Sequence, residues 1–549
     1  MGRPTILQRR SRPRAALAAA AAGAFLLTSA AHADDRPAIT VAVQQIVNAG
    51  VLDTLREQSN VGSRIFPSIF DTLVEVDRQG DLSVGPALAE SWKRIDDKTI
   101  EFTLRKGVMF HNGEEMTAED VVFSFGPERM WGFAKAGDAP KTGQTLFTQG
   151  ASQSSAAPPE VHAVARRLLP GFERMEAVDR YTVRYHNKAP DVTLEGRLTR
   201  TGMNVVSKKA FLAAPDWRTF AAAPVATGPY KVKEFKPDNV LVLEAHDAYW
   251  GGKPNAREIR FVVVPEVAGR INGLISGQYD FVTDVPPDQI KTIEASAKHD
   301  VVGGPVLNYR LTVFDKNHPQ LKDPRVRRAL TLAIDRKLIV DTLWSGRTSI
   351  PQGLQWEYYG PMFVKDWQAP AYDPEAARKL LKEAGYKGEP IPFRVLNNYY
   401  ANQVPNAQIL QEMWRAVGAN VVIEMKENWQ QIFAKDGSRA VRDWSNSAPF
   451  NDPVSSIVTQ HCPHGQQQQV GEWSNEEFNT LCAELETSTD QARRPVVFRR
   501  MLEIIERDDP GYTVLHRTVL FYGKRKDLDW KYSPTQAMDF RATNLKISK

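Results

Sequence analysis

The clearest pattern of apolar and polar positions lies between Phe70 and Phe125. Thr99 to Leu104 alternates polar and apolar side chains, which is typical of a half-buried strand. Extended structure resumes at Val108 to Phe110 after Lys106-Gly107. Asn112-Gly113 then supplies residues that tolerate positive φ, so the backbone can reverse tightly there. The pattern predicts consecutive extended segments followed by a turn.

A helix is predicted directly after this turn. Thr117 stands at the N-cap position, and Asp120 follows three residues later, as in a capping box. The apolar side of the helix would consist of Val121, Val122, Phe123 and Phe125. This run therefore predicts a strand, a turn and a capped helix.

Other segments extend the mixture of strands and helices along the chain. Strands are predicted at Ile39–Val43, Phe261–Val264, Phe281–Val282, Asn308–Phe314 and Tyr512–Tyr522. Two helices are predicted from an N-cap followed by proline, at Asp323-Pro324 and at Asp373-Pro374, the second ending at Gly385. Exposed loops are predicted at 151–160 and at Gln466–Gln469. The fold class predicted is α/β, with mixed sheets flanked by helices.

Residues 1–33 have the pattern of a secretory signal peptide. Five arginines precede an alanine-rich apolar segment, and Ala31-His32-Ala33 fits a cleavage site before Asp34. The apolar segment is short for a retained membrane span, and no cysteine for lipid attachment lies near the site. Arg9-Arg10 leaves both general secretion and twin-arginine export open. We expect a soluble periplasmic protein.

The net charge and the length of the chain bear on its partners and on its number of lobes. The net charge of +5 equals the charge of the five leader arginines, so the rest of the chain is balanced. This balance gives no reason to expect nucleic acid or an anionic membrane as a partner. A chain of 549 residues exceeds what one hydrophobic core usually organises, so two or more lobes are expected.

The two cysteines, Cys462 and Cys482, lie in one late segment. In an exported protein they predict a disulfide that closes a loop containing the glutamine run. The alternative is a metal site, because His461-Cys462-Pro463-His464 combines thiol and imidazole ligands. Both readings stay open from the sequence, and our expectation is the disulfide, with no metal and no cofactor.

Several segments together resemble the family 5 extracellular solute-binding proteins, the dipeptide, oligopeptide and nickel receptors of ABC importers. The resemblance begins in the Phe70–Phe125 run and continues, in the family's order, through four blocks. These are ATGPYKVKEFKPDNVLVLEAHDAYWGGKPNAREIRFVVVPE from Ala226, GQYDFVTDVPP from Gly277, DPRVRRALTLAIDRKLIVDTLWSG from Asp323 and YDPEAARKLLKEAGY from Tyr372.

The resemblance implies a periplasmic clamshell of two lobes with an extra subdomain in the first. After the signal peptide (1–33), lobe I would span 34–307 with an inserted subdomain at about 76–200, lobe II would span 308–505, and 506–549 would return to lobe I. Such a receptor closes around its ligand, and the transporter recognises the closed state.

The function implied is capture of a peptide or peptide-like solute for an ABC permease, by a monomer that is not an enzyme. Receptors for an opine, an oligosaccharide or a nickel chelate are alternatives within the class. An extracytoplasmic enzyme or chaperone is the alternative from another class, although the sequence contains no G-x-S-x-G, H-E-x-x-H or Walker A motif.

Peptide-binding members of the family pair the peptide ammonium with a carboxylate in a W-x-x-D loop. In the corresponding stretch, Trp444 is followed by Asn446 and by Ser447 at the acid's position. Either Asp443 or Asp452 replaces the missing charge, or the ligand presents no ammonium there, because a buried ammonium without a counter-charge is costly. Asn446 and Ser447 would then suit a hydroxyl-rich solute.

Candidate ligand contacts follow from loop position and from the resemblance. Loop aromatics are expected to form stacking walls, and Arg310 on the crossing strand is a candidate partner for a ligand carboxylate. Tyr359 and Tyr400 accompany these aromatics in the same loops. The complete predicted set is Asn48, Arg64, Phe66, Tyr309, Arg310, Trp356, Tyr358, Asn397, Tyr399, Trp444, Asn446, Ser447 and Asp452.

Overall fold

The computed structural model describes residues 34–131, 157–397 and 399–548. The predicted signal peptide and most of the predicted loop at 151–160 lie outside the described residues. Within the described ranges, no helix combines the length and apolar character needed to cross a bilayer.

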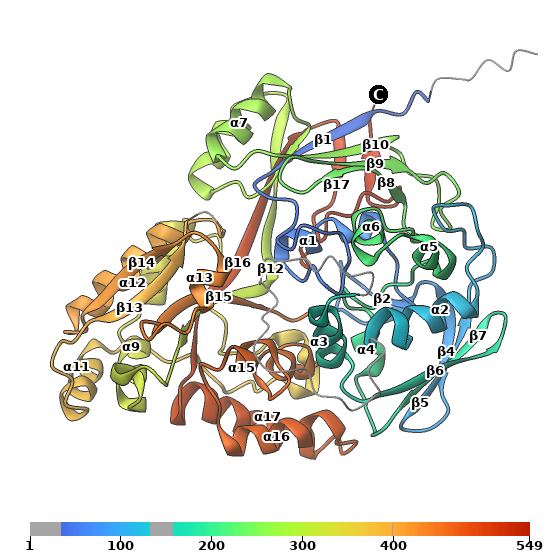
Figure 1. The fold of residues 1–549 in the computed structure, drawn as a ribbon. Helices are drawn as coiled ribbons and strands as arrows, with labels where there is room; N and C mark the ends of the chain where they lie inside the picture. The colour runs from blue at the N-terminus through green and yellow to red at the C-terminus, as the bar shows by residue number, and fades with distance from the viewer. Residues whose placement is uncertain (1–33, 132–156, 398, 549) are drawn as a thin grey trace, which may run out of the picture. The chain divides into compact units, whose positions relative to one another are not determined.

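A large mixed sheet organises the described chain (Figure 1). Its ten strands run in the order β14-β13-β15-β12-β16-β11-β1-β10-β9-β8. In chain order they are β1 (Ala38–Val43), β8 (Tyr230–Lys236), β9 (Val240–Ala245), β10 (Glu258–Val263), β11 (Phe281–Val282), β12 (His299–Phe314), β13 (Ile391–Leu396), β14 (Val421–Lys426), β15 (Val441–Ser447) and β16 (Tyr512–Arg525). The strands predicted at Ile39–Val43, Phe261–Val264, Phe281–Val282, Asn308–Phe314 and Tyr512–Tyr522 correspond to β1, β10, β11, β12 and β16 of this sheet.

The two longest strands of this sheet, β12 and β16, are antiparallel neighbours at its centre (Figure 1). Their pairing runs from His299 opposite Arg525 to Val313 opposite Tyr512. It is interrupted between Pro305 and Tyr309, where three residues of β12 face one of β16. Such bulges bend a strand and redirect its side chains. The predicted lobe boundary at 307/308 falls inside this bulge.

A separate four-stranded sheet lies in the region of the predicted inserted subdomain. Its order is β4-β5-β7-β6, formed by β4 (Ala89–Arg94), β5 (Thr99–Leu104), β6 (Phe172–Asp179) and β7 (Thr182–Asn187). Helix α2 (Ala118–Ser124) follows the predicted turn, and the Asp120 carboxylate accepts a hydrogen bond of 3.0 Å from the backbone N–H of Thr117. The predicted strand, turn and capped helix are confirmed.

Short strand pairs complete the sheets. They are β2 (Val74–Val76) with β3 (Val84–Pro86), and β17 (Leu528–Trp530) with β18 (Leu545–Ile547). The remaining helices are α1 (Asn60–Ser63), α3 (Pro159–Leu168), α4 (Leu194–Leu198), α5 (Lys208–Ala213), α6 (Trp217–Ala222), α7 (Val267–Ser276), α8 (Ile290–Glu294), α9 (Pro324–Leu332), α10 (Arg336–Trp344), α11 (Pro374–Glu383), α12 (Gln403–Ala416), α13 (Trp429–Phe433), α14 (Ile457–His461), α15 (Gln466–Val470), α16 (Glu476–Thr487) and α17 (Arg493–Glu503).

The proline-headed helices begin where predicted. Asp323 caps α9 and Asp373 caps α11, each with proline in the first turn, and Gly385 has the positive φ of a helix end. Alternation along β1 sends Ile39, Val41 and Val43 into one hydrophobic cluster and Ala42 into another. Both faces of the large sheet are thus covered, as in an α/β layered fold.

The glutamine run corrects one prediction. Gln466–Gln469 was expected to be an exposed loop, but it forms most of α15, and Gln467 is fully buried. The reason is a tertiary contact, because the amide oxygen of Gln467 accepts a hydrogen bond from buried Arg442. Burial of a polar side chain is tolerated when it is hydrogen-bonded.

Candidate functional site

A cavity lies where β15, the β12 bulge and α1 approach one another. Its volume is about 180 Å³. The lining draws on segments from every part of the chain and is rich in polar side chains. It comprises Gln58, Ser59, Asn60, Ser63, Pro67, Val76, Arg78, Arg167, Thr199, Arg200, Thr201, Leu307, Tyr399, Tyr400, Trp444, Ser445, Ser447, Ala448, Pro449, Gln460, Gln466, Thr535, Gln536 and Ala537.

Strand β15 supplies one wall of the cavity. Ser445 and Ser447 lie two residues apart and so project from the same face of the strand. Asn308 of the β12 bulge donates hydrogen bonds to both hydroxyl oxygens, at 3.2 Å and 2.9 Å. The bulge therefore positions β15 side chains at the cavity, and Leu307 itself lines it.

Aromatic side chains from the segment after β13 form a second wall. Tyr399 and Tyr400 contact each other edge to face, with ring centroids 4.6 Å apart. The hydroxyl of Tyr400 lies 3.1 Å from that of Ser445, and Tyr399 packs edge to face against Trp429. These rings add aromatic surface to a lining that combines polar side chains with apolar ones such as Val76 and Leu307.

The charge of the lining is one-sided. It contains three guanidinium groups, which we call the arginine cluster (Arg78, Arg167 and Arg200), and no Asp or Glu among the described residues. Burial lowers the pKa of Arg167 to about 10. Burial, together with the neighbouring charges of Arg167 and Arg197, lowers the pKa of Arg200 to about 9. The cavity is electropositive.

The C-terminal segment closes the cavity with a backbone in an uncommon conformation. Gln536 has φ of 68°, in the left-handed region, although it is not glycine. Its side chain is buried and lines the cavity beside Thr535 and Ala537. Residues held in this region need support from the surrounding structure and are often found at binding sites.

The structure brings three of the predicted ligand contacts to the cavity, namely Tyr399, Trp444 and Ser447. Phe66 lines a smaller neighbouring cavity of about 40 Å³, which shares Arg78 with the main one. The other predicted residues lie outside both linings, because most of their side chains make contacts within the protein.

Arg310 is already paired. Its guanidinium forms an ion pair with Asp443, and both side chains are almost fully buried. Its charged end also lies over the Tyr400 ring, 3.3 Å from the centroid, while Gln403 donates a hydrogen bond of 2.9 Å to Asp443. Burial raises the pKa of Asp443 despite the neighbouring Arg310 charge. Arg310 and Asp443 therefore neutralise each other's charge, and neither is left to pair with a ligand.

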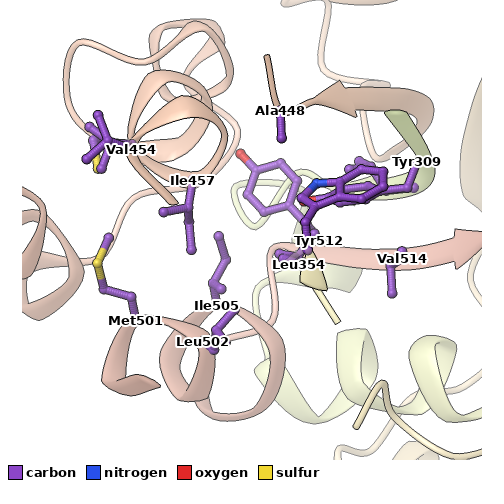
Figure 2. Close-up of a cluster of buried hydrophobic side chains, with 14 of the residues drawn as sticks. Tyr309, Leu354, Ala448, Val454, Ile457, Met501, Leu502, Ile505, Tyr512 and Val514 are labelled. Carbon is purple, nitrogen blue, oxygen red and sulfur yellow. The ribbon is translucent and has the colours of Figure 1, made fainter. Parts of the chain in front are cut away.

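Three predicted aromatics belong to the hydrophobic core. Tyr309 is fully buried and stacks on Trp356, with ring centroids 5.0 Å apart. Figure 2 shows Tyr309 lying among side chains such as Leu354 and Ala448. Tyr358 also stacks on Trp356, with ring centroids 5.6 Å apart, and donates a hydrogen bond of 2.9 Å to the carbonyl of Ala448. This aromatic stack supports the cavity wall from behind.

Asn446 and Asp452 also turn away from the cavity. Asn446 is fully buried, and its amide nitrogen lies 2.7 Å from His461 Nε2. Both carboxylate oxygens of Asp452 accept hydrogen bonds from Arg494, at 2.8 Å and 3.0 Å. Both aspartates considered as replacements for the family's acid are therefore engaged in internal ion pairs.

The remaining predicted residues act elsewhere. Arg64 is buried and bonds both oxygens of Asp284, at 3.1 Å and 3.2 Å. Asn48 donates a hydrogen bond of 3.3 Å to the hydroxyl of Tyr399, which places it behind a cavity residue. Asn397 is exposed.

Cys462 and Cys482 form a disulfide, with 5.8 Å between their Cα atoms. It joins the end of α14 to α16. His461 is fully buried, and its burial lowers its pKa to about 3. Within the described ranges, no group of three or more His, Cys, Asp or Glu side chains is arranged to hold a metal ion.

Sequence reasoning missed the arginine cluster. One signal was available, since Arg167 stands on α3 among Val164 and Leu168, both fully buried, where an apolar side chain would be expected. A basic residue on the buried side of an amphipathic helix requires a partner or a site. Arg78 and Arg200 carry no comparable local pattern.

Comparison with known proteins places this arrangement in a family. The family model described as "Bacterial extracellular solute-binding proteins, family 5 Middle" matches residues 83–466. The dipeptide-binding protein of Escherichia coli (strain K12) is 26% identical over 492 residues, covering 84% of this chain and 85% of that protein.

Two solved structures share the fold. One is the periplasmic binding protein DppA from Helicobacter pylori in complex with the peptide STSA, with a TM-score of 0.79, 21% identity, and coverage of 93% of this chain and 98% of that one. The other is MoaA from A. tumefacien R10 in complex with mannopinic acid, with a TM-score of 0.77, 20% identity, and coverage of 94% and 100%. The fold is the two-lobe α/β clamshell of periplasmic binding proteins, and the chain belongs to the family 5 bacterial extracellular solute-binding proteins.

Proposed function

We infer that this protein is the periplasmic receptor of an ABC importer, which captures a peptide or peptide-like organic solute and delivers it to a membrane permease. The observation that carries this proposal is the cavity, because its lining combines residues from 34–307, 308–505 and 506–549. A solute held there contacts all three predicted segments at once. Ligand binding would then favour the closed arrangement of the lobes.

The β12 bulge supports a hinge at this place. Three residues of β12 face one residue of β16 between Pro305 and Tyr309, so the pairing of these strands is irregular beside the cavity. We propose lobe boundaries at 307/308 and 505/506, a monomer in solution, and cleavage of the leader after Ala33. The function is binding and release, with no bond made or broken.

An opine-type acid is a second candidate solute. The MoaA structure contains mannopinic acid, and the described lining of the present cavity includes no carboxylate to pair with a peptide ammonium. Ser447 lies at the cavity wall in the position where the peptide-binding pattern has an acid.

The test is a thermal-shift screen of purified protein comprising residues 34–549. Dipeptides, tripeptides, opines, oligosaccharides and nickel with histidine are each added at millimolar concentration, and calorimetry follows for every compound that raises Tm. A cleft ligand at 100 times its Kd stabilises the native state by about 2.7 kcal/mol. Turnover of a solute by the isolated protein would contradict the receptor proposal and favour an enzyme.

A further inference from the structure

Among the described residues, the arginine cluster has no ion-pair partner; Arg78 interacts electrostatically with Asp539, so the guanidinium groups left without a nearby counter-charge are those of Arg167 and Arg200. Arg167 is only 6% exposed, and among the described residues its one hydrogen bond goes to the amide oxygen of Gln58 at 3.2 Å. Its Nε atom is buried and has no hydrogen-bond partner among the described residues. A buried guanidinium normally has a carboxylate or another acceptor within reach.

Arg200 and Arg78, which lie on two other segments, also have incompletely satisfied guanidinium groups or only neutral acceptors among the described residues. In the part of the chain that the structure describes, the acceptors of Arg200 are neutral, namely the carbonyl of Ser455 and the hydroxyl of Thr459, both at 3.2 Å. Arg78, after β2, has a buried Nη1 atom without a described partner. Within the described ranges, none of the three guanidinium groups has a carboxylate within ion-pair distance.

Neighbouring arginines of the same region contrast with the cluster. Arg197, three residues before Arg200, pairs with Asp191 at 2.9 Å and with Glu486 at 2.7 Å. Arg494 is paired with Asp452 in the same way. Arg336, a core arginine for which the described chain supplies no ion-pair partner, is instead satisfied by four hydrogen bonds to backbone carbonyls and the Thr513 hydroxyl, whereas Arg167 has a single hydrogen bond among the described residues.

Converging guanidinium groups without counter-charges repel each other and favour an anion between them. Each guanidinium presents parallel N–H donors that match the two oxygens of a carboxylate or phosphate. In a partly desolvated cavity such charge-assisted hydrogen bonds are stronger than in water. The same charges disfavour a ligand that carries a free ammonium at this point.

From this arrangement we propose that the solute captured in the cavity is an anion with at least two acid groups, whose oxygens are bound by Arg167 and Arg200 with Arg78 at the mouth toward the smaller cavity. The proposal rests on the receptor function proposed above and specifies its ligand class. The serine hydroxyls and amide groups of the lining then bind the rest of the solute.

The experiment compares each acidic probe with its neutral isostere on the same protein. Calorimetric Kd values are measured for Ala-Glu against Ala-Gln, for N-(1-carboxyethyl)alanine against its monoamide, and for phosphoserine-alanine against serine-alanine. We expect at least one acidic probe to bind tenfold or more tightly than its isostere. The first two pairs and the third distinguish a carboxylate ligand from a phosphate ligand.

Single variants test whether the preference for the acidic probe depends on Arg167 and Arg200. Arg167→Gln and Arg200→Gln should each weaken the preferred acidic probe at least tenfold and leave its isostere within about twofold. Arg166→Gln is the matched control, because Arg166 precedes Arg167 on α3 and does not line the cavity. Circular dichroism and Tm establish that each variant is folded, and the wild-type comparison of probe and isostere needs no variant.

Acidic probes that bind no more tightly than their isosteres would overturn the proposal, as would an unchanged preference in Arg167→Gln and Arg200→Gln. Tight binding of neutral or basic peptides, without binding of acids, would overturn the anion proposal and leave the receptor function standing. Absence of binding in every class of solute would contradict both.

Discussion

The ion pair between Arg310 and Asp443 shows how single residues support the cavity wall. Asp443→Asn keeps the shape of the side chain and its contact with Gln403, but leaves the buried Arg310 guanidinium without a counter-charge. We expect a loss of about 3–5 kcal/mol in the free energy of unfolding, measured by urea denaturation. The double variant Arg310→Leu with Asp443→Leu should lose less, because no charge stays buried. A loss below about 1 kcal/mol in Asp443→Asn would show that the pair is not desolvated.

Glu506 predicts a pH dependence of stability. Burial raises its pKa to about 7, although the backbone N–H of Leu354 and the indole of Trp367 donate hydrogen bonds to it. A raised carboxyl pKa means that the folded protein holds the proton longer than the unfolded chain. The resulting stabilisation is complete below about pH 4.5 and is lost as the pH rises to about 7.

Glu506→Gln should remove this contribution, which has a slope of up to about 1.4 kcal/mol per pH unit between pH 4.5 and 7. The measurement is urea denaturation of both proteins at several pH values, and the difference between the two curves isolates Glu506. The buried histidines His461 and His516, whose pKa values burial lowers to about 3, act in the opposite direction but in both proteins alike. Parallel curves would contradict the prediction.

At the scale of elements, the pairing of β12 with β16 depends on Gly303. This residue has φ of 138°, and a Cβ atom there would lie 2.1 Å from the backbone oxygen of Leu520. Gly303→Ala should therefore cost about 2 kcal/mol or more in urea denaturation. Gly304→Ala is the matched control, because its Cβ would meet the hydroxyl of Tyr532, a side chain that can move. Equal costs for the two variants would contradict this account.

The disulfide predicts a second effect at this scale. Cys462 and Cys482 are 20 residues apart, and a cross-link over such a loop typically contributes about 3 kcal/mol by restricting the unfolded chain. The variant with both cysteines replaced by serine should lose about this amount in chemical denaturation. Added reductant should destabilise the wild type and leave the variant unchanged; a reductant effect on the variant would point to another cause.

Much of the local structure could be predicted from the sequence, because its causes are local. Asp-Pro pairs fix where α9 and α11 begin, and alternation fixes β5 and β1. Strand β12 was predicted from Asn308 but begins at His299. Gly303-Gly304-Pro305 interrupts the apolar pattern, and only pairing with β16 holds that part extended.

The site was less predictable for a physical reason. Loop aromatics are visible in a sequence, and Tyr399 and Trp444 do line the cavity. Whether an arginine is paired depends on which carboxylate the fold brings beside it. Arg310 and Arg64 therefore looked like ligand contacts and proved to be paired, whereas Arg78, Arg167 and Arg200 meet only in the folded chain.

At the scale of the whole molecule, ligand binding should change both stability and dimensions. With the preferred solute at 100 times its Kd, the free energy of unfolding should rise by about 2.7 kcal/mol. Small-angle scattering should show a smaller radius of gyration in the saturated protein than in the free protein, because closure brings the lobes together. A solute of similar size that gives no calorimetric heat serves as the control. Identical scattering profiles with and without bound solute would contradict closure.

The continuity of β12 limits how the lobes of this receptor can be produced as separate fragments. The predicted boundary at 307/308 falls within a strand that runs unbroken from His299 to Phe314, and β16 passes beside it in the opposite direction. A single cut of the gene at that point would give each fragment half of a strand and an unpaired edge. Neither lobe can be produced as a simple truncation, and an isolated lobe would require both crossings to be severed and rejoined by a designed connection.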